Sequence, residues 1–185
     1  MPTEPKLTFT LTKDDVLLML LFINSHSTEA IYKRKNERLN HSLFVTLLGL
    51  VVFFTQNKPV GVFFIILSIL IFLLIPRYYA KRDFKFYSKY IDTHLSDLVG
   101  HPIEISFDDE CIAINYHTGE TKQRISSLKY IAQVKDYCFL KYNTGSGMVI
   151  PLRQLPDSTA VIENIKNRAA DHQIPFHTDL DWKWK

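Results

Sequence analysis

Two apolar runs follow one another in the chain, residues 43–55 and 60–75. Only four residues separate them: Gln56, Asn57, Lys58 and Pro59. A helix rises about 1.5 Å per residue, so crossing about 30 Å of hydrocarbon takes about 20 residues. The second run, VGVFFIILSILIFLLI, has no charge, and each run reaches the required length with a few flanking residues. The sequence therefore predicts a transmembrane helical hairpin over residues 42–79.

A pair of buried helices in a soluble protein is the alternative interpretation of these runs. Both runs are apolar all round, however, and leave no polar face for water. This composition favours the bilayer over a protein interior.

Basic residues are distributed unequally around the hairpin. Four precede the first run: Lys33, Arg34, Lys35 and Arg38. Five follow the second: Arg77, Lys81, Arg82, Lys85 and Lys89. The turn carries only Lys58, so the positive-inside rule predicts that both termini lie in the cytoplasm.

The five basic residues after the second run are mixed with aromatic side chains in the segment YYAKRDFKFYSKYI. This mixture suits a helix that emerges through an anionic leaflet, where each Lys or Arg contributes about 1 kcal/mol. We therefore predict a membrane-surface site at Arg77, Lys81, Arg82, Lys85 and Lys89. A helix that uses its amphipathic face to pack against its own domain is the alternative.

The remaining composition sets further limits on function. The 185-residue chain has a net charge of +3, too small to indicate nucleic-acid binding. Cys111 and Cys138 lie among β-branched and aromatic residues, which is typical of reduced, buried thiols in a cytoplasmic domain. The polar, acidic start MPTEPKLTFTLTKDD does not resemble a cleavable secretory signal.

Before the hairpin, residues 6–11 alternate as a strand does, with Leu7, Phe9 and Leu11 on one side. Thr12 is a candidate N-cap for a following helix that runs to Ile23. Residues 24–27 break it, and a second helix from residue 28 leads into the membrane. Because an isolated strand cannot satisfy its backbone groups, residues 7–11 are expected to pair with the C-terminal sheet.

After the hairpin, residues 78–98 have the pattern of one continuous helix, ended by Gly100 and Pro102. From His101 the apolar period becomes two, which predicts antiparallel strands. The expected strands cover residues 103–107, 111–116, 121–125, 128–135, 138–142 and 148–152. A last amphipathic helix opens at Pro156 and Asp157, and a tail with Trp182 and Trp184 closes the chain.

This outline resembles the bacterial YcxB-like family of small membrane proteins, which pairs a two-helix membrane hairpin with a pleckstrin-homology-like (PH-like) domain. The segment MVIPLRQL, with Val149, Ile150, Pro151 and Arg153, stands close to the I-I-P-basic pattern of the family's last strand. The family often has a tryptophan before the strand that Leu128 starts, and this chain has Ser126 and Ser127 instead. The resemblance implies an architecture more than an activity.

The expected fold class is an α+β membrane protein, in which the hairpin is inserted before a PH-like antiparallel meander or half-barrel with a C-terminal helix. The expected parts are a cytoplasmic N-terminal region (1–41), the hairpin (42–79), a basic aromatic juxtamembrane helix (80–100), the PH-like cytoplasmic domain (101–172) and the tail (173–185). The expected location is the bacterial inner membrane.

Motifs for catalysis are lacking. The seven histidines show no metal-type spacing, and the acidic residues 108–110 are best interpreted as a solvated hairpin turn. The glycines of the loop 143–147 could cradle a phosphate, but no P-loop lysine follows them. No Ser-His-Asp arrangement can be placed, so no enzyme, metal or cofactor is expected.

Two functions therefore remain open. In the first, the domain is a membrane-anchored recognition or scaffolding module for a protein partner, another copy of the chain or the lipid surface. Its candidate partner-binding residues are Asn143, Gly145, Gly147 and Arg153. In the second, the chain is an immunity or regulatory subunit whose hairpin pairs with a membrane-acting toxin or channel. The small residues Gly49, Gly61 and Ser68 could then admit the partner helix.

Overall fold

The chain forms two compact units in a computed structural model that describes residues 6–55 and 58–184. One unit is the segment Asn24–Phe86. The other combines Met1–Ile23 with Tyr87–Trp184 and holds both sheets. The predicted α+β class, with an apolar helical hairpin and antiparallel strands, is confirmed.

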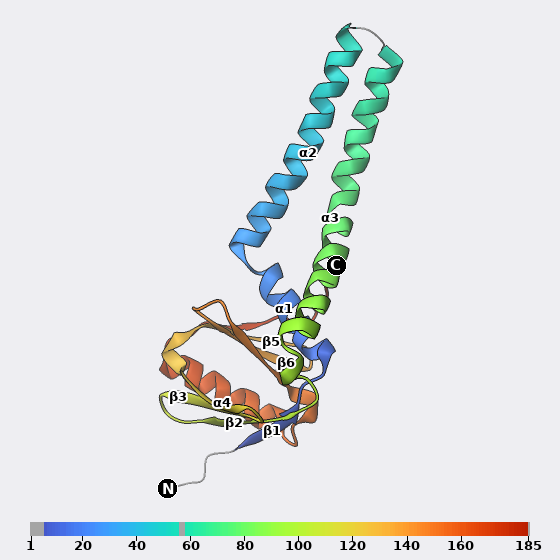
Figure 1. Cartoon of the computed structure of the whole chain (residues 1–185). Helices are drawn as coiled ribbons and strands as arrows, with labels where there is room; N and C mark the ends of the chain where they lie inside the picture. Colours follow the sequence, from blue (N-terminus) through green and yellow to red (C-terminus); the bar gives the residue numbers. More distant parts are fainter. Residues whose placement is uncertain (1–5, 56–57, 185) are drawn as a thin grey trace. The chain divides into compact units, whose positions relative to one another are not determined.

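Two long helices make the hairpin, and they run side by side (Figure 1). They are α2, Thr28–Thr55, and α3, Lys58–His94. Gln56 and Asn57, two residues of the predicted turn, lie outside the described residues. The other two turn residues, Lys58 and Pro59, belong to the first turn of α3 instead, where proline needs no backbone N–H partner.

The juxtamembrane helix expected at residues 80–100 is not a separate element. It is the second half of α3, which passes through Pro76 without a break. It also ends earlier than predicted, at His94, and a short 3₁₀ turn, η1 (Ser96–Leu98), follows.

The first sheet confirms that the N-terminal strand joins the C-terminal half of the chain. Its order is β1-β2-β3-β4, antiparallel throughout. The strands are β1 (Leu7–Thr10), β2 (Pro102–Phe107), β3 (Cys111–Tyr116) and β4 (Gly119–Arg124). Leu7 lies opposite Ile105 and Phe9 opposite Ile103. The hairpin is therefore an insertion between two adjacent strands of one sheet.

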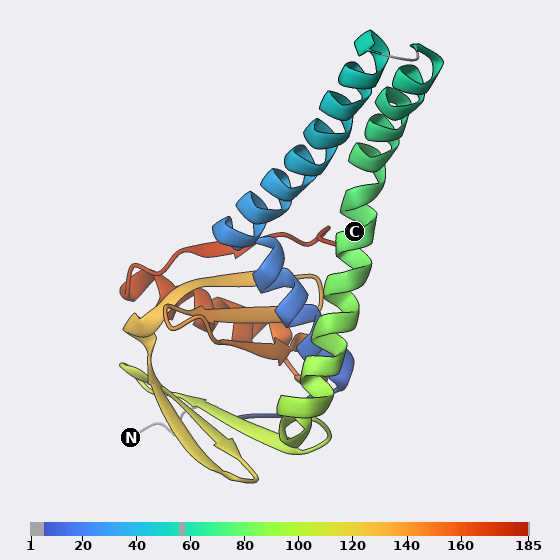
Figure 2. The same ribbon diagram turned by 45° about the horizontal axis from the view of Figure 1, so that its top comes forward.

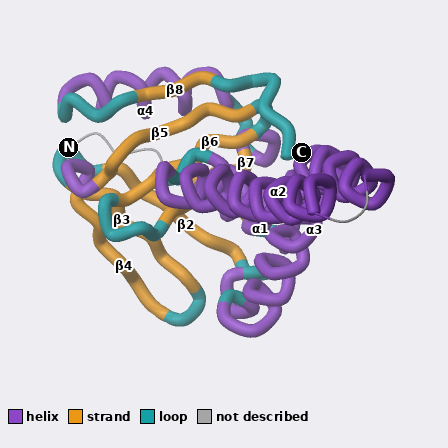
Figure 3. The backbone as a smooth tube through the Cα atoms, turned by 90° about the horizontal axis from the view of Figure 1, so that it is seen from above, coloured by secondary structure: helices purple, strands orange, loops and turns teal. Residues whose placement is uncertain are grey.

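The second sheet has the order β7-β6-β5-β8. Its strands are β5 (Leu128–Val134), β6 (Tyr137–Tyr142), β7 (Gly147–Pro151) and β8 (Phe176–Thr178). β8 pairs in parallel with β5 at the sheet edge (Figure 3). The predicted tail therefore contains a strand that the sequence analysis missed. Pro175 contributes to the pairing, because its carbonyl accepts from the Ile131 amide.

Two helices complete this unit. Helix α1 (Lys13–Ser25) starts after Thr12, as predicted, and helix α4 (Ser158–Asp171) starts after Asp157, whose carboxylate accepts from the Ala160 amide. Figure 2 shows α4 beside the two sheets. Its residues Ile162, Ile165 and Ala169 join one core with both sheets and α1.

The core explains the two cysteines. Cys138 is fully buried, and burial raises the pKa of its thiol to about 12. Cys111 is only half-buried, which corrects the prediction that both would be buried. Both are free thiols, as expected.

Candidate functional site

The hairpin has apolar side chains that protein does not cover. Only 6% of the most apolar window of α2 and 11% of that of α3 is buried. Phe44 is 70% exposed and Phe54 is 79% exposed. A core helix of a soluble protein would be mostly buried. Both helices are long and apolar enough to cross a membrane.

Two glycines bring the hairpin helices into close contact. A Cβ atom at Gly61 would lie 2.4 Å from Cβ of Phe53, so only glycine fits there. A Cβ at Gly49 would lie 3.0 Å from Cβ of Phe64. Small residues that allow backbones to approach are typical of helix packing in membranes.

Ser68 adds polar contacts within the same interface. Its hydroxyl accepts from Thr46 Oγ1 at 2.9 Å, and its carbonyl accepts from Ser42 Oγ at 3.2 Å. The three small residues that the sequence offered to a partner helix, Gly49, Gly61 and Ser68, are therefore all buried in the hairpin's own interface.

Arg38 serves a backbone group that Pro76 leaves without a donor. In a regular helix the amide of residue 76 would donate to the carbonyl of Phe72, but proline has no N–H. Arg38 Nε of α2 donates to that carbonyl at 2.8 Å. Its guanidinium also lies 3.5 Å from the centre of the Phe72 ring. The arginine thus links α2 to the carbonyl in α3 that loses its helical donor at the proline.

We predict that the cost of replacing Arg38 depends on Pro76. Arg38→Met should destabilise the hairpin by about 1.5–3 kcal/mol, the usual value of a hydrogen bond to a charged group. In a Pro76→Ala background the loss should be clearly smaller, because alanine supplies the missing N–H. SDS titration of the detergent-solubilised chain, followed by circular dichroism, measures both. The ring contact is common to both backgrounds and cancels. Equal losses would show that Arg38 does not serve the carbonyl.

The five predicted membrane-surface residues lie together on α3. Arg77, Lys81, Lys85 and Lys89 recur every four residues, and Arg82 follows Lys81. At 3.6 residues per turn this spacing places them along one face of the helix. All five are exposed. We call this set the basic stripe.

Acidic partners of α3 lie off the stripe. Asp83 accepts from Arg34 of α2 at 2.9 Å and from Asn24 at 3.2 Å. Arg82 is the one stripe member with contacts of this kind, 3.5 Å from Asp83 and stacked over the Tyr79 ring at 4.2 Å. The lysines of the stripe have no carboxylate partner in the part of the chain that the structure describes.

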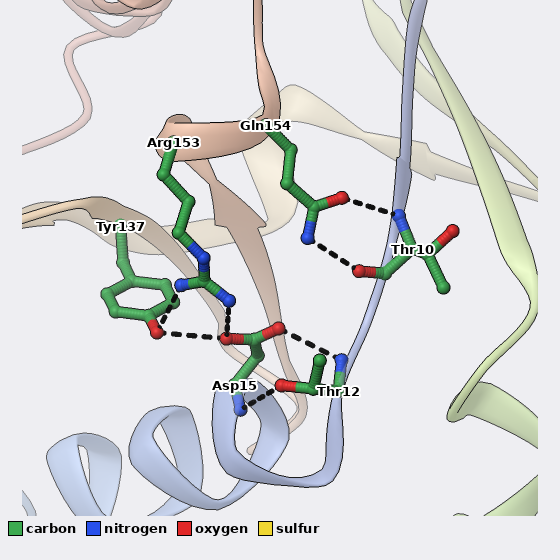
Figure 4. A network of polar contacts seen from close by, with 6 residues as sticks. All are labelled: Thr10, Thr12, Asp15, Tyr137, Arg153 and Gln154. Carbon is green, nitrogen blue, oxygen red and sulfur yellow. Dashed lines mark hydrogen bonds and ion pairs between the residues drawn. The ribbon is translucent and has the colours of Figure 1, made fainter.

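A buried carboxylate lies in the other unit. Asp15, on the first turn of α1, is fully buried. Its Oδ1 accepts from Arg153 Nη2 at 2.6 Å and from the Tyr137 hydroxyl at 2.9 Å (Figure 4). Its Oδ2 accepts from the Thr12 amide at 2.9 Å, while the Thr12 hydroxyl accepts from the Asp15 amide at 3.3 Å. This reciprocal pair is a capping box.

The environment of Asp15 keeps it ionised. Burial alone would raise the pKa of this carboxyl. The hydrogen bonds from the Thr12 amide, Arg153, the Thr12 hydroxyl and Tyr137 outweigh burial and hold the pKa below its ordinary value. The pKa of Tyr137 is raised, first by burial and then by its bond to Asp15.

Gln154, beside Arg153 in the 3₁₀ turn η3 (Leu152–Gln154), holds the preceding strand. Its Oε1 accepts from the Thr10 amide at 2.9 Å, and its Nε2 donates to the Thr10 carbonyl at 2.8 Å (Figure 4). Arg153 and Gln154 together fasten the β1–α1 connection to the end of β7. This arrangement is structural, and it occupies the guanidinium that the sequence analysis offered to a partner.

The four predicted partner-binding residues do not gather in one place. Asn143, Gly145 and Gly147 lie in the β6–β7 loop or at the start of β7, and Arg153 lies beyond the other end of that strand. Asn143 and Gly145 are exposed, and Gly145 has a φ of +93° that favours glycine. Gly145 and Gly147 line an apolar cavity that the sequence did not reveal.

Other polar clusters offer little chemistry. The acidic turn 108–110 is exposed, and its backbone carbonyls accept from Arg168 and contact His172. Within residues 6–55 and 58–184, no group of three or more His, Cys, Asp or Glu could hold a metal ion. His101 and His117 stack with their ring centres 3.9 Å apart.

No family model, curated protein or solved structure was found to match the chain.

Proposed function

We propose that the chain is a non-enzymatic recognition module anchored in the bacterial inner membrane. The observation that carries this proposal is the exposure of the hairpin. Large apolar side chains cover α2 and α3 between residues 43 and 74, and many are about half exposed or more. Soluble proteins rarely expose so much contiguous apolar surface. A bilayer is the solvent that would make this surface favourable.

The proposed orientation places the sheet-containing unit in the cytoplasm. Both chain segments that leave the hairpin lead into that unit, and both carry basic residues. The positive-inside rule then puts both on the cytoplasmic side.

We also propose that this unit is PH-like and that the chain is a YcxB-like protein. Three features support the first idea: the β1–β4 meander, the β5–β7 meander and the C-terminal helix α4. The hairpin inserted after the first strand and the sequence around Pro151 support the second. The parallel strand β8 is an addition to the expected half-barrel.

The basic stripe is proposed to hold the module against anionic headgroups. Its lysines extend from an exposed helix face without carboxylate partners in the described residues, so their charge is available to a surface. Such interactions are screened over about 10 Å at moderate salt.

Charge removal from the stripe tests this role. In Lys81, Arg82, Lys85, Lys89→Gln, the domain should stay folded, while its approach to anionic liposomes loosens in a salt-sensitive way. A matched control changes four exposed lysines elsewhere: Lys122, Lys135, Lys166 and Lys183. Quenching of a headgroup-attached fluorophore pair measures the approach. Topology must be checked alongside, because the stripe also fixes orientation. Equal behaviour on anionic and neutral bilayers, before and after mutation, would contradict the role.

The partner of the module is proposed to be a protein bound through the sheet-containing unit. The alternative, pairing with a toxin or channel through Gly49, Gly61 and Ser68, gains no support, because these residues already contact the hairpin's own helices. Affinity capture from gently solubilised membranes distinguishes the two functions. Soluble partners favour the module, and one abundant integral-membrane partner favours the alternative.

A further inference from the structure

An apolar cavity of about 260 Å³ lies within the sheet-containing unit. Side chains of α1, the end of α3, both sheets and the β6–β7 loop line it, among them Val16, Met19, Leu98 and Met148. An apolar cavity of about 150 Å³ is known to stay dry and bind benzene. This cavity is large enough for part of an aliphatic chain.

The mouth of the cavity lies at the β6–β7 loop, because Gly145 and Ser146 belong to the lining and are exposed. A cationic group lies beside it. Lys141 Nζ donates to the carbonyl of Gly145. Burial lowers the pKa of Lys141, and the positive charge of nearby Lys129 lowers it further. Across the described residues neither lysine has a carboxylate partner, so the mouth carries uncompensated positive charge.

A hydroxyl group without a partner lies near the lining. Tyr142 is 4% exposed, and its hydroxyl has no hydrogen-bond partner among the described residues. Burial raises the pKa of Tyr142 to about 12, and Tyr116, which lines the cavity, lies near enough to add to that rise. Buried polar atoms are seldom left unpaired, so this hydroxyl indicates an occupant with a polar atom.

We propose that the cavity binds a single-chain anionic amphiphile of the fatty-acid type. The chain lies among Met19, Leu98 and Met148, and the carboxylate lies at Lys141 beside the β6–β7 loop. The apolar lining excludes a polar metabolite, and the two lysines favour an anion over a neutral alcohol. The site belongs entirely to the sheet-containing unit and does not depend on the hairpin crossing a membrane.

Photo-crosslinking of the full chain in phosphatidylcholine nanodiscs tests the proposal. One probe is decanoic acid with a diazirine at the chain end, and the other is phosphatidylglycerol with the same acyl chain. Peptide mass spectrometry should find adducts on α1 around Met19 and on β7 around Met148. Labelling by the free acid alone identifies a fatty acid, and labelling by the phospholipid identifies a membrane lipid as the source.

Two variants separate the chain from the headgroup. Leu98→Trp fills the cavity and should reduce these adducts at least about tenfold, whereas Leu180→Trp, at an exposed position outside the lining, should not. Lys141→Gln should weaken labelling about tenfold, because a charge-assisted hydrogen bond is lost, and Lys122→Gln should not. Circular dichroism checks folding, and Ser146→Trp, at the exposed mouth, replaces Leu98→Trp if that variant unfolds.

Adducts confined to the hairpin, or adducts at Met19 and Met148 that neither tryptophan variant reduces, would overturn the site. Full labelling of Lys141→Gln would overturn the anionic headgroup. Neither result would bear on membrane anchoring, which topology mapping tests separately.

Discussion

Replacing Arg153 with methionine should destabilise the sheet-containing unit by about 2–4 kcal/mol. The change leaves the fully buried Asp15 carboxylate without its cation, and breaking a buried ion pair from one side usually costs about 3–5 kcal/mol. We expect the lower part of that range because the Arg153 side chain is 40% exposed and water can partly replace it. Urea unfolding in detergent measures the loss through Trp182, which contacts Phe22 in the core.

The loss should also depend on pH. The folded pKa of Asp15 lies below its ordinary value of 3.8, so the stabilisation is present above that value and disappears as the pH falls through the folded pKa. The gap between wild type and Arg153→Met should therefore be widest near neutral pH and shrink in acid. Arg124→Met, at an exposed position on β4, is the matched control and should change stability by less than about 0.5 kcal/mol. A variant as stable as this control, or a gap independent of pH, would contradict the structural role of the pair.

Replacing Phe9 with alanine should cost about 3–5 kcal/mol, the usual loss for a fully buried phenylalanine. Phe9 is 3% exposed and lies opposite Ile103, so the N-terminal strand contributes directly to the core of a unit whose other strands follow the hairpin. Deleting residues 1–11 should destabilise the unit further, since it removes the whole strand. Thr8→Ala, at an exposed position on the same strand, should be nearly neutral.

Limited proteolysis gives a second measure of the same effect. Residues 101–175 should become protease-sensitive in Phe9→Ala and stay resistant in Thr8→Ala. Unchanged resistance in both would mean that the C-terminal part folds without β1 and that the hairpin is not an insertion into a single unit.

Local sequence patterns were sufficient to predict most of the elements. Alternation over short segments located β2 and β3 nearly residue by residue, because one face of each strand must be buried. Thr12 was a visible N-cap, and two all-round apolar runs made the hairpin recognisable. The strand β8 was missed because three residues after a proline show no alternation, and its pairing with β5 depends on a contact across more than forty residues.

The contacts that define the candidate sites were beyond sequence reasoning for the same reason. Asp15 was identified as a residue that suits the helix dipole, but Arg153 lies 138 residues further along the chain. Pro76 and Arg38 each have an ordinary local explanation, and only the antiparallel helices bring the arginine to the carbonyl of Phe72. The cavity has lining residues from several elements, none of which signals it alone. The basic stripe, by contrast, was predictable because it needs only one helix.

The most direct test of membrane anchoring is a cysteine-accessibility map of the full chain. Cys111→Ser removes the half-buried thiol, and Cys138 can stay, because full burial and a pKa raised to about 12 leave it unreactive. Single cysteines are then placed at Lys6, Lys58 and Lys183, which are exposed. A membrane-impermeant maleimide applied to intact bacterial spheroplasts should label Lys58→Cys at once, and Lys6→Cys and Lys183→Cys only after lysis. Labelling of Lys183→Cys in intact spheroplasts, or protection of Lys58→Cys there, would contradict a hairpin that spans the membrane with both termini in the cytoplasm.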